Sequence, residues 1–366
     1  MKFAHFAQIF PRRGETAAER YEQLWRELEL CDELGFDFGF ASIHHLSHMR
    51  PQATVYCTAA AARTRRIRLG PMGYTGALYD PLRIVEEVAV LDNAIHGRLE
   101  VGLVTGVTRD EFRVYHADWD NRGAIANEAL ELFVKAFTSE KPFDFEGRFH
   151  RYEEVRLSVD PLQKPHPPTW LISLQSDARR LAAATGSHTG YSFFRSRLEA
   201  APEVGDYLRM WRDHGHRHEP NVVYPAFIYV GETDAEAVAT ASPLLRTSME
   251  EIYGGELGGG GIARAETIQR QGQVQSAEIR RNMFDIDFLR ERDVIFVGAP
   301  DTVAAKLQAA AAEGLFNVFA GEFNIGAIRE EDLMRSIRLF ATHVIPELRK
   351  FDPTLPYLSP TVGAAR

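Results

Sequence analysis

The sequence is poor in cysteine and has no long hydrophobic run. Only two of its 366 residues are cysteine, Cys31 and Cys57, which excludes a disulfide framework, and both fall in segments with helical spacing. No stretch of about 18 apolar residues occurs, so we expect no membrane-spanning helix. The first residues lack the apolar core and cleavage site that a signal peptide needs. We therefore expect a cytoplasmic protein with two buried thiols.

The chain also has no excess of basic residues. It carries 42 Lys and Arg against 51 Asp and Glu, a net charge of −9. This acidic balance argues against a nucleic-acid-binding surface and against docking on an anionic membrane. Hydrophobic residues make up 45% and charged residues 25%, as in an ordinary globular enzyme. The composition favours a small molecule as the partner.

Short apolar runs alternate with segments of helical spacing. Thr16 and Glu19 form a capping box at the start of a helix that Gly35 would end, and Asp80 with Pro81 begins another. Because a helical segment lies between each strand and the next, the strands should pair in parallel. The eight predicted strands are residues 2–10, 36–41, 67–72, 99–104, 169–174, 189–194, 221–230 and 317–320.

Eight strand–helix units in succession predict an α/β fold, the (β/α)8 TIM barrel, formed by residues 1–366 as a single domain. The alternative is an open doubly wound sheet with a second domain, but no G-x-G-x-x-G follows the first strand. Residues 141–168 are predicted as a long loop, and Asp301 as the cap of a late helix. The polar stretch at about 250–292 is predicted to be an insertion or lid.

Catalytic residues of such a barrel lie at the carboxyl ends of its strands. His44 and His45 follow the second strand, and neighbouring side chains on an extended chain point to opposite faces. One of them can therefore face the mouth, where a histidine could act as a general acid or base. The alternative is a pair of loop histidines without a role.

The segment Leu171–Gly186 joins a strand to a helix through polar residues. A helix N-terminus presents backbone N–H groups, which makes it a ready site for phosphate, and Arg179 and Arg180 could add charge. An ordinary capped helix with surface arginines explains the segment equally well. The histidine-rich run His214–Glu219 lies at the amino-terminal end of a strand, so we interpret it as a solvated loop and predict no metal site.

Several segments together resemble the bacterial luciferase-like, flavin-dependent monooxygenases. They cover nearly the whole chain and include the histidine pair and an LD-x4-GR motif, Leu91, Asp92, Gly97 and Arg98. The other matching segments are Leu69–Gly106, Thr108–Arg122, Val297–Phe319 and Arg335–Arg349. Single segments are weakly specific, whereas the ordered set is strongly specific.

The resemblance implies a barrel that binds reduced FMN (FMNH2), supplied by a separate flavin reductase. In that family oxygen adds to flavin C4a, and the peroxide oxidises an organic substrate. The expected substrate is a small hydrophobic aldehyde, ketone or terpenoid. Relatives often form dimers or tetramers, so a homo-oligomer, in particular a dimer, is expected. The alternatives are an F420-dependent oxidoreductase, a non-catalytic flavin-binding subunit and a metal-dependent hydrolase.

The resemblance also implies roles for individual residues. His44 matches the catalytic histidine, and Met72–Gly73 matches a non-prolyl cis peptide beneath the flavin ring. The residues expected to bind the cofactor are Met72, Gly73, Thr105, Leu174, Gln175, Ser176, Ala178 and Arg179. Those expected to contact substrate are Phe6, His45, Tyr74, Phe193 and Phe194, although core packing is the alternative explanation for the aromatic residues.

The chain departs from the family at two places. Ile43 stands where the family often has glutamate. Val104–Thr105 stands where the catalytic subunit of luciferase has Cys–Arg, so one phosphate partner is missing and light emission is not expected. Arg122, Arg179 or Arg180 could replace that arginine.

Overall fold

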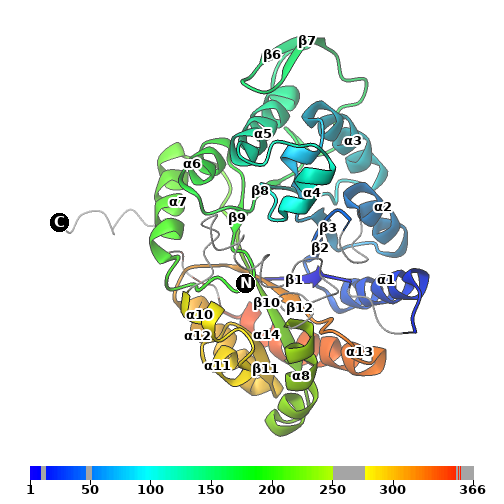
Figure 1. Cartoon of the computed structure of the whole chain (residues 1–366), viewed down its shortest axis with the longest axis vertical. Helices are drawn as coiled ribbons and strands as arrows, with labels where there is room; N and C mark the ends of the chain where they lie inside the picture. The colour runs from blue at the N-terminus through cyan, green and yellow to red at the C-terminus, as the bar shows by residue number, and fades with distance from the viewer. Residues whose placement is uncertain (10–13, 47–51, 250–276, 352, 354, 356–366) are drawn as a thin grey trace, which may run out of the picture.

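A computed structural model describes residues 1–9, 14–46, 52–249, 277–351, 353 and 355. Eight parallel strands form its central ring, and helices surround them (Figure 1). The ring strands are β1 (Lys2–Ala7), β2 (Phe38–Ala41), β3 (Arg68–Pro71), β5 (Val101–Val104), β8 (Thr169–Leu171), β9 (Thr189–Gly190), β10 (Val222–Val230) and β12 (Val318–Glu322).

The ring is closed by parallel pairing throughout. One sheet runs from β10 through β12, β1 and β2 to β3, with β9 on the other side of β10, and a second sheet pairs β5 with β8. Isolated parallel bridges, Leu69 to Leu99 and Trp170 to His188, join the two sheets. These are the eight strands that the sequence predicted, so the (β/α)8 barrel is confirmed and the open sheet is wrong.

The helices follow the strands in the expected alternation. Thr16 and Glu19 form the capping box of α1, Gly35 ends it at φ 82°, and Asp80 caps α3. The helices that follow strands are α1 (Ala17–Leu34), α2 (Ala53–Arg63), α3 (Pro81–Ala94), α4 (Arg109–Val114), α5 (Arg122–Thr138), α6 (Ser176–Thr185), α7 (Ala201–His214), α8 (Asp234–Met249), α12 (Pro300–Ala312) and α13 (Glu330–Leu339). Shorter elements are β4 (Tyr74–Thr75), a 3-10 turn (Gly76–Leu78), a π-helical turn (Phe340–Val344) and α14 (Ile345–Arg349).

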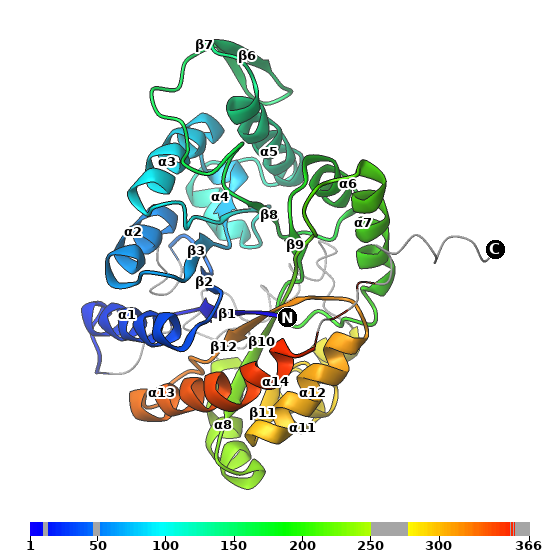
Figure 2. The same ribbon diagram turned by 180° about the vertical axis from the view of Figure 1, so that it is seen from behind.

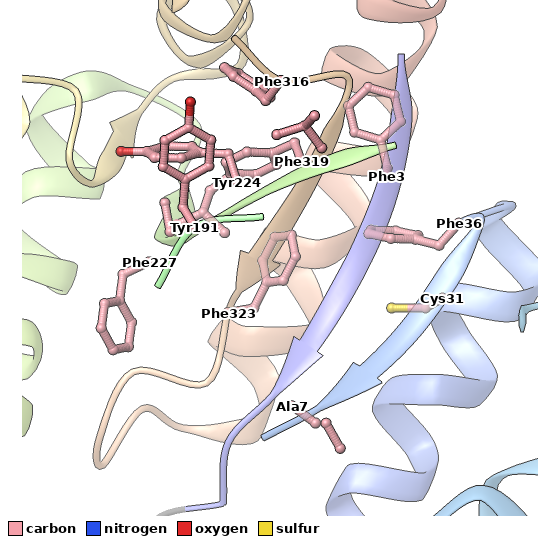
Figure 3. Close-up of a cluster of buried hydrophobic side chains, with 14 of the residues drawn as sticks. Phe3, Ala7, Cys31, Phe36, Tyr191, Tyr224, Phe227, Phe316, Phe319 and Phe323 are labelled. Atoms are coloured by element: carbon pink, nitrogen blue, oxygen red, sulfur yellow. The ribbon is translucent and has the colours of Figure 1, made fainter. Parts of the chain in front are cut away.

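Two apolar layers hold the ring. Inside it, Phe6, Phe40, Met72 and Trp170 pack together with Ala320. Outside it, a larger core fills the space between strands and helices, and Figure 3 shows part of that core. Both cysteines belong to the outer core and have no exposed surface, as the sequence predicted, and burial raises the pKa of each thiol. Within the described residues, no helix is long and apolar enough to cross a membrane.

Three sequence predictions about connecting segments need correction. The segment 141–168 is not a plain loop, because it contains the antiparallel hairpin of β6 (Phe143–Glu146) and β7 (Arg151–Val155), which projects from the barrel in Figure 1. Phe143 and Phe145 are buried and alternate with exposed Asp144 and Glu146, which is the two-residue period of a strand. The prediction of a loop rested on amino-acid composition and missed this period.

The region after α8 also differs from its prediction. Residues 250–276 of the predicted insertion lie outside the described part, whereas α10 (Ala277–Arg281) and α11 (Ile286–Glu291) follow it. The strand β11 (Phe296–Gly298), which was not predicted, pairs with the end of β10. Ala299, not Asp301, is the N-cap of α12, because Pro300 takes the first helical position.

A buried histidine at the amino-terminal end of the ring should make stability depend on pH. Burial first, and then the charges of His218, Lys2 and Arg68, lower the pKa of His188 from 6.5 to about 3. Between these values the unfolded chain binds a proton that the folded chain excludes, so stability should fall as pH decreases below 6.5. The slope from this residue is about 1.4 kcal/mol per pH unit.

Comparing the wild type with His188→Gln isolates this contribution from that of the carboxylates. Urea unfolding of both proteins at pH 7 and at pH 4.5 should show the wild type losing about 2.5 kcal/mol relative to the variant at the lower pH. An unchanged difference at the two pH values would contradict the lowered pKa.

Candidate functional site

The carboxyl ends of the strands bring a histidine and a carboxylate together. His44 follows β2, and its Nδ1 lies 3.3 Å from Oε1 of Glu111 on the first turn of α4. The Glu111 side chain is only 3% exposed, whereas that of His44 is 21% exposed. The buried carboxylate can accept the Nδ1 proton and fix the orientation of the ring, which directs Nε2 away from Glu111.

His45 lies in a different environment. Its side chain is buried, its Nε2 is 3.0 Å from the hydroxyl of Tyr79, and its ring packs edge-on against Tyr115. Burial lowers the pKa of His45, although the nearby Glu111 charge opposes this. The side chain of His44 is partly exposed and that of His45 is buried, so the adjacent histidines lie in different environments. This position leaves little of His45 to contact a substrate.

The end of β3 passes very close to β5. The Met72–Gly73 peptide bond is cis, as the resemblance implied. A Cβ atom on Gly73 would lie 2.3 Å from the carbonyl oxygen of Gly102, and one on Gly102 would lie 2.2 Å from that of Pro71. Only glycine fits on either side of this contact. Met72 points into the ring, where it joins the interior cluster.

The predicted phosphate turn is an uncapped helix N-terminus. Gln175 is the N-cap of α6 but makes no side-chain capping hydrogen bond, and both Gln175 and Ser176 are exposed. Ala178 is buried in the first turn, and Arg179 donates a hydrogen bond to the carbonyl of Leu174. The Nε of Arg179 is buried without a hydrogen-bond partner. The turn therefore presents the first N–H groups of α6 and the Ser176 hydroxyl, while the N–H of Gln175 donates to Oγ of Ser173 at 3.4 Å.

Of the predicted aromatic residues, only two meet inside the mouth. Phe6 belongs to the interior cluster, and the Phe193 ring packs against it edge-on with centroids 5.1 Å apart. Tyr74 is buried in the outer core, with its hydroxyl 3.3 Å from Oγ1 of Thr54. Phe194 is also in the outer core, at φ 61°. Tyr74 and Phe194 therefore pack in the core, which was the alternative explanation for the aromatic residues.

Thr105 follows β5 and is 9% exposed. The two other arginines considered as phosphate partners are engaged elsewhere. Arg122 lies 4.0 Å from the ring centroid of Trp119, and Arg180 is exposed and pairs with Asp177. Arg179 lies in the first turn of α6, and its guanidinium also lies 3.5 Å from Oδ2 of Asp206.

Sequence reasoning missed Glu111. It lies inside a segment that carried the family resemblance, but no role was assigned to it. The signal that could have found it is a carboxylate in the first turn of the helix that follows the fourth ring strand, at the same end of the barrel as His44.

The fold and this polar mouth define a (β/α)8 barrel with a histidine–carboxylate pair at its carboxyl end. The family model of the luciferase-like monooxygenases matches residues 1–317. The chain belongs to that family.

Comparison with curated proteins gives distant relatives. The chain is 33% identical over 177 residues to uncharacterized protein y4wF of Sinorhizobium fredii, covering 48% of this chain and 52% of that protein. It thus spans about half the length of this relative. It is 22% identical to the FMNH2-dependent dimethylsulfone monooxygenase of Pseudomonas putida (88% and 87% covered) and 23% identical to the alkanal monooxygenase alpha chain of Photobacterium leiognathi (95% and 99% covered).

Solved structures share the whole fold. Monooxygenase RslO1 from Streptomyces bottropensis superposes with a TM-score of 0.76 at 25% identity, covering 94% of this chain and 99% of that one. The oxygenating constituent of 3,6-diketocamphane monooxygenase from Pseudomonas putida, in complex with FMN, gives 0.74 at 19% identity (95% and 98%). An F420-dependent secondary alcohol dehydrogenase gives 0.68 at 16% identity (95% and 99%). The last two show similarity of fold alone.

Proposed function

We propose that this protein is the oxygenase component of a two-component monooxygenase that uses reduced FMN and O2 to oxygenate a small hydrophobic molecule. The observation that supports this most is the His44–Glu111 pair at the same end of the barrel as the uncapped start of α6. Relatives described as FMNH2-dependent or as an oxygenating constituent agree with it.

The residues of the mouth fit FMN. The N-terminus of α6, the Ser176 hydroxyl and the unpaired Nε of Arg179 suit the phosphate, with Leu174, Gln175 and Ala178 forming the turn. Met72 and Gly73 would lie beneath the flavin ring, and Thr105 would stand beside it. When bound, reduced FMN supplies the electrons that activate oxygen.

The protein's own groups would position the reactants and move a proton. Glu111 would hold the imidazole of His44 through Nδ1, so that Nε2 accepts or donates a proton in the mouth. Phe6 and Phe193 would form an apolar contact surface for the substrate and help to exclude water. That surface agrees with an aldehyde, ketone or terpenoid as the substrate.

A reductase and a second copy of the chain are the proposed partners. The reductase would supply the reduced FMN. Val55 on α2 and Val90 on α3 are exposed apolar side chains (63% and 51%) that a second copy could cover. Analytical ultracentrifugation tests the dimer.

The second candidate is an F420-dependent oxidoreductase, which the fold of the alcohol dehydrogenase favours. The two differ in their use of oxygen. We expect oxygen consumption that depends on substrate with reduced FMN, measured over a panel of aldehydes, ketones and terpenoids. Turnover with F420 that consumes no oxygen would instead support the F420-dependent oxidoreductase.

Arg179→Gln should weaken the binding of reduced FMN. Loss of a charged donor to the phosphate should cost about 1.5–3 kcal/mol, which is roughly a tenfold to hundredfold increase in Kd. Arg180→Gln is the matched control, because that side chain is 64% exposed and pairs with Asp177, and its Kd should change less than about twofold. Anaerobic fluorescence titration measures both. Equal affinities in the two variants would remove Arg179 from the phosphate site.

A further inference from the structure

A cavity of about 990 Å³ opens at the amino-terminal end of the barrel. The starts of β1, β2, β3 and β8 surround it, and Figure 2 shows the N-terminus at the centre of the ring of helices. The cavity is as large as small-molecule sites usually are. Because His44 lies at the opposite end of the strands, the function proposed above leaves this cavity unused.

The cavity wall carries more positive than negative charge that lacks an ion-pair partner. Two of its three acids are already paired, Glu100 with Arg68 at 2.5 Å and Asp37 with Arg349 at 3.1 Å, and the third, Glu219, is exposed. Its two lysines, Lys2 and Lys164, are exposed and form no ion pair with a carboxylate in the described part of the chain.

The polar contacts among Lys2, Asn221 and His188 contain one hydrogen-bond acceptor too few. Nδ1 of His188 accepts the backbone N–H of Asn221 at 3.1 Å, and Nε2 lies 3.0 Å from the side-chain amide of the same residue. Lys2 Nζ lies 2.9 Å from the other end of that amide. Since the imidazole is neutral at pH 7 and Nδ1 accepts, Nε2 must carry the ring proton.

Neither orientation of the Asn221 amide satisfies both neighbours. If its oxygen faces Lys2, its NH2 group faces the N–H of His188. If its oxygen faces His188, its NH2 group faces the ammonium of Lys2. Each arrangement brings two hydrogen-bond donors together without an acceptor between them. Asn221 and His188 are both buried, at 7% and 6% exposure. In the second arrangement, an acceptor from the cavity could bind the NH2 group and Lys2 together.

We propose that the amino-terminal mouth of the barrel binds a small molecule through an oxyanion group, a phosphate or a carboxylate. The oxyanion accepts hydrogen bonds from Lys2 Nζ and from the side-chain NH2 group of Asn221 on the cavity side, and the Asn221 oxygen then accepts the hydrogen bond from Nε2 of His188. Lys164 on the cavity wall adds longer-range attraction. The site is separate from the flavin site and does not depend on the proposed function.

The test is ligand-dependent stability. A ligand that binds only the folded state raises the unfolding midpoint in proportion to its occupancy. The midpoint of the full chain is measured against inorganic phosphate and, separately, against succinate, at pH 7.5 and at constant ionic strength set with sodium chloride. Lys2→Gln is compared with Lys350→Gln, which removes the same charge from an exposed lysine that pairs only with Glu347.

We expect the apparent Kd to be about tenfold or more weaker in Lys2→Gln than in Lys350→Gln, because a charged hydrogen bond is lost. Lys164→Gln should weaken binding by roughly twofold to fivefold, and it serves as the second variant if Lys2→Gln does not fold. A response to phosphate alone identifies a phosphate site, and a response to succinate alone a carboxylate site. Equal responses of all three variants to both anions would overturn the proposal.

Discussion

His44→Ala should lower the rate of substrate oxygenation by about 100-fold or more, while the Kd for reduced FMN changes less than about threefold. A positioned general acid or base contributes about 10²–10⁴ to a rate. The start of α6 and the Met72–Gly73 contact lie on other elements than His44, so the proposed cofactor site should survive. Single-turnover product formation, with a substrate from the panel that the wild type oxidises, measures the first effect, and anaerobic titration measures the second.

Glu111→Gln separates positioning from proton transfer. The amide keeps the size of the side chain but removes the charge that stabilises a protonated His44. We expect a smaller loss of rate than in His44→Ala and a shift of the pH–rate profile toward lower pH. An unchanged rate in His44→Ala would show that this residue takes no part in the mechanism. An unchanged pH–rate profile in Glu111→Gln would show that Glu111 does not act through His44.

Gly102→Ala should destabilise the barrel by about 3 kcal/mol, the upper end of the usual cost of overpacking. The added methyl group would lie 2.2 Å from the carbonyl oxygen of Pro71 and 3.0 Å from the Met72 Sδ atom, so β3 and β5 must move apart. The displacement should also weaken the binding of reduced FMN, because Met72 and Gly73 lie at the same contact. Urea unfolding and anaerobic titration measure the two effects.

Gly123→Ala is the control for that substitution. Gly123 lies in the first turn of α5, and nothing stands within 4 Å of an added Cβ there. Alanine in a helix should leave stability unchanged or raise it by about 0.5–1 kcal/mol. Similar losses in both glycine variants would show that close approach of β3 and β5 is not the cause.

The sequence predicted best what depends on neighbouring residues. The capping box of Thr16 and Glu19, the left-handed Gly35 and the Asp80 cap of α3 are local arrangements, and all three are present in the structure. The eight ring strands followed from their alternation with helices. The hairpin β6–β7 and the strand β11 were missed, because they lie outside the alternation of strands and helices from which the ring strands were predicted.

The site was harder to predict, because its contacts join distant parts of the chain. His44 and Glu111 are 67 residues apart, so no spacing rule could pair them. Tyr74 was expected at the mouth, but β3 ends at Pro71 and β4 begins at Tyr74, so the alternation of sides does not continue between them. Which face a residue presents after a strand ends depends on the closed barrel and not on the local sequence.

Rapid mixing with oxygen tests the central claim most directly. The protein is first saturated with reduced FMN without oxygen, and the return of oxidised-flavin absorbance is then followed after mixing with oxygenated buffer. We expect reoxidation to be delayed well beyond that of free reduced FMN, because the mouth around His44 and Phe193 shelters the flavin, and to change when a substrate is added. Reoxidation at the rate of the free flavin, with the barrel intact, would contradict the account.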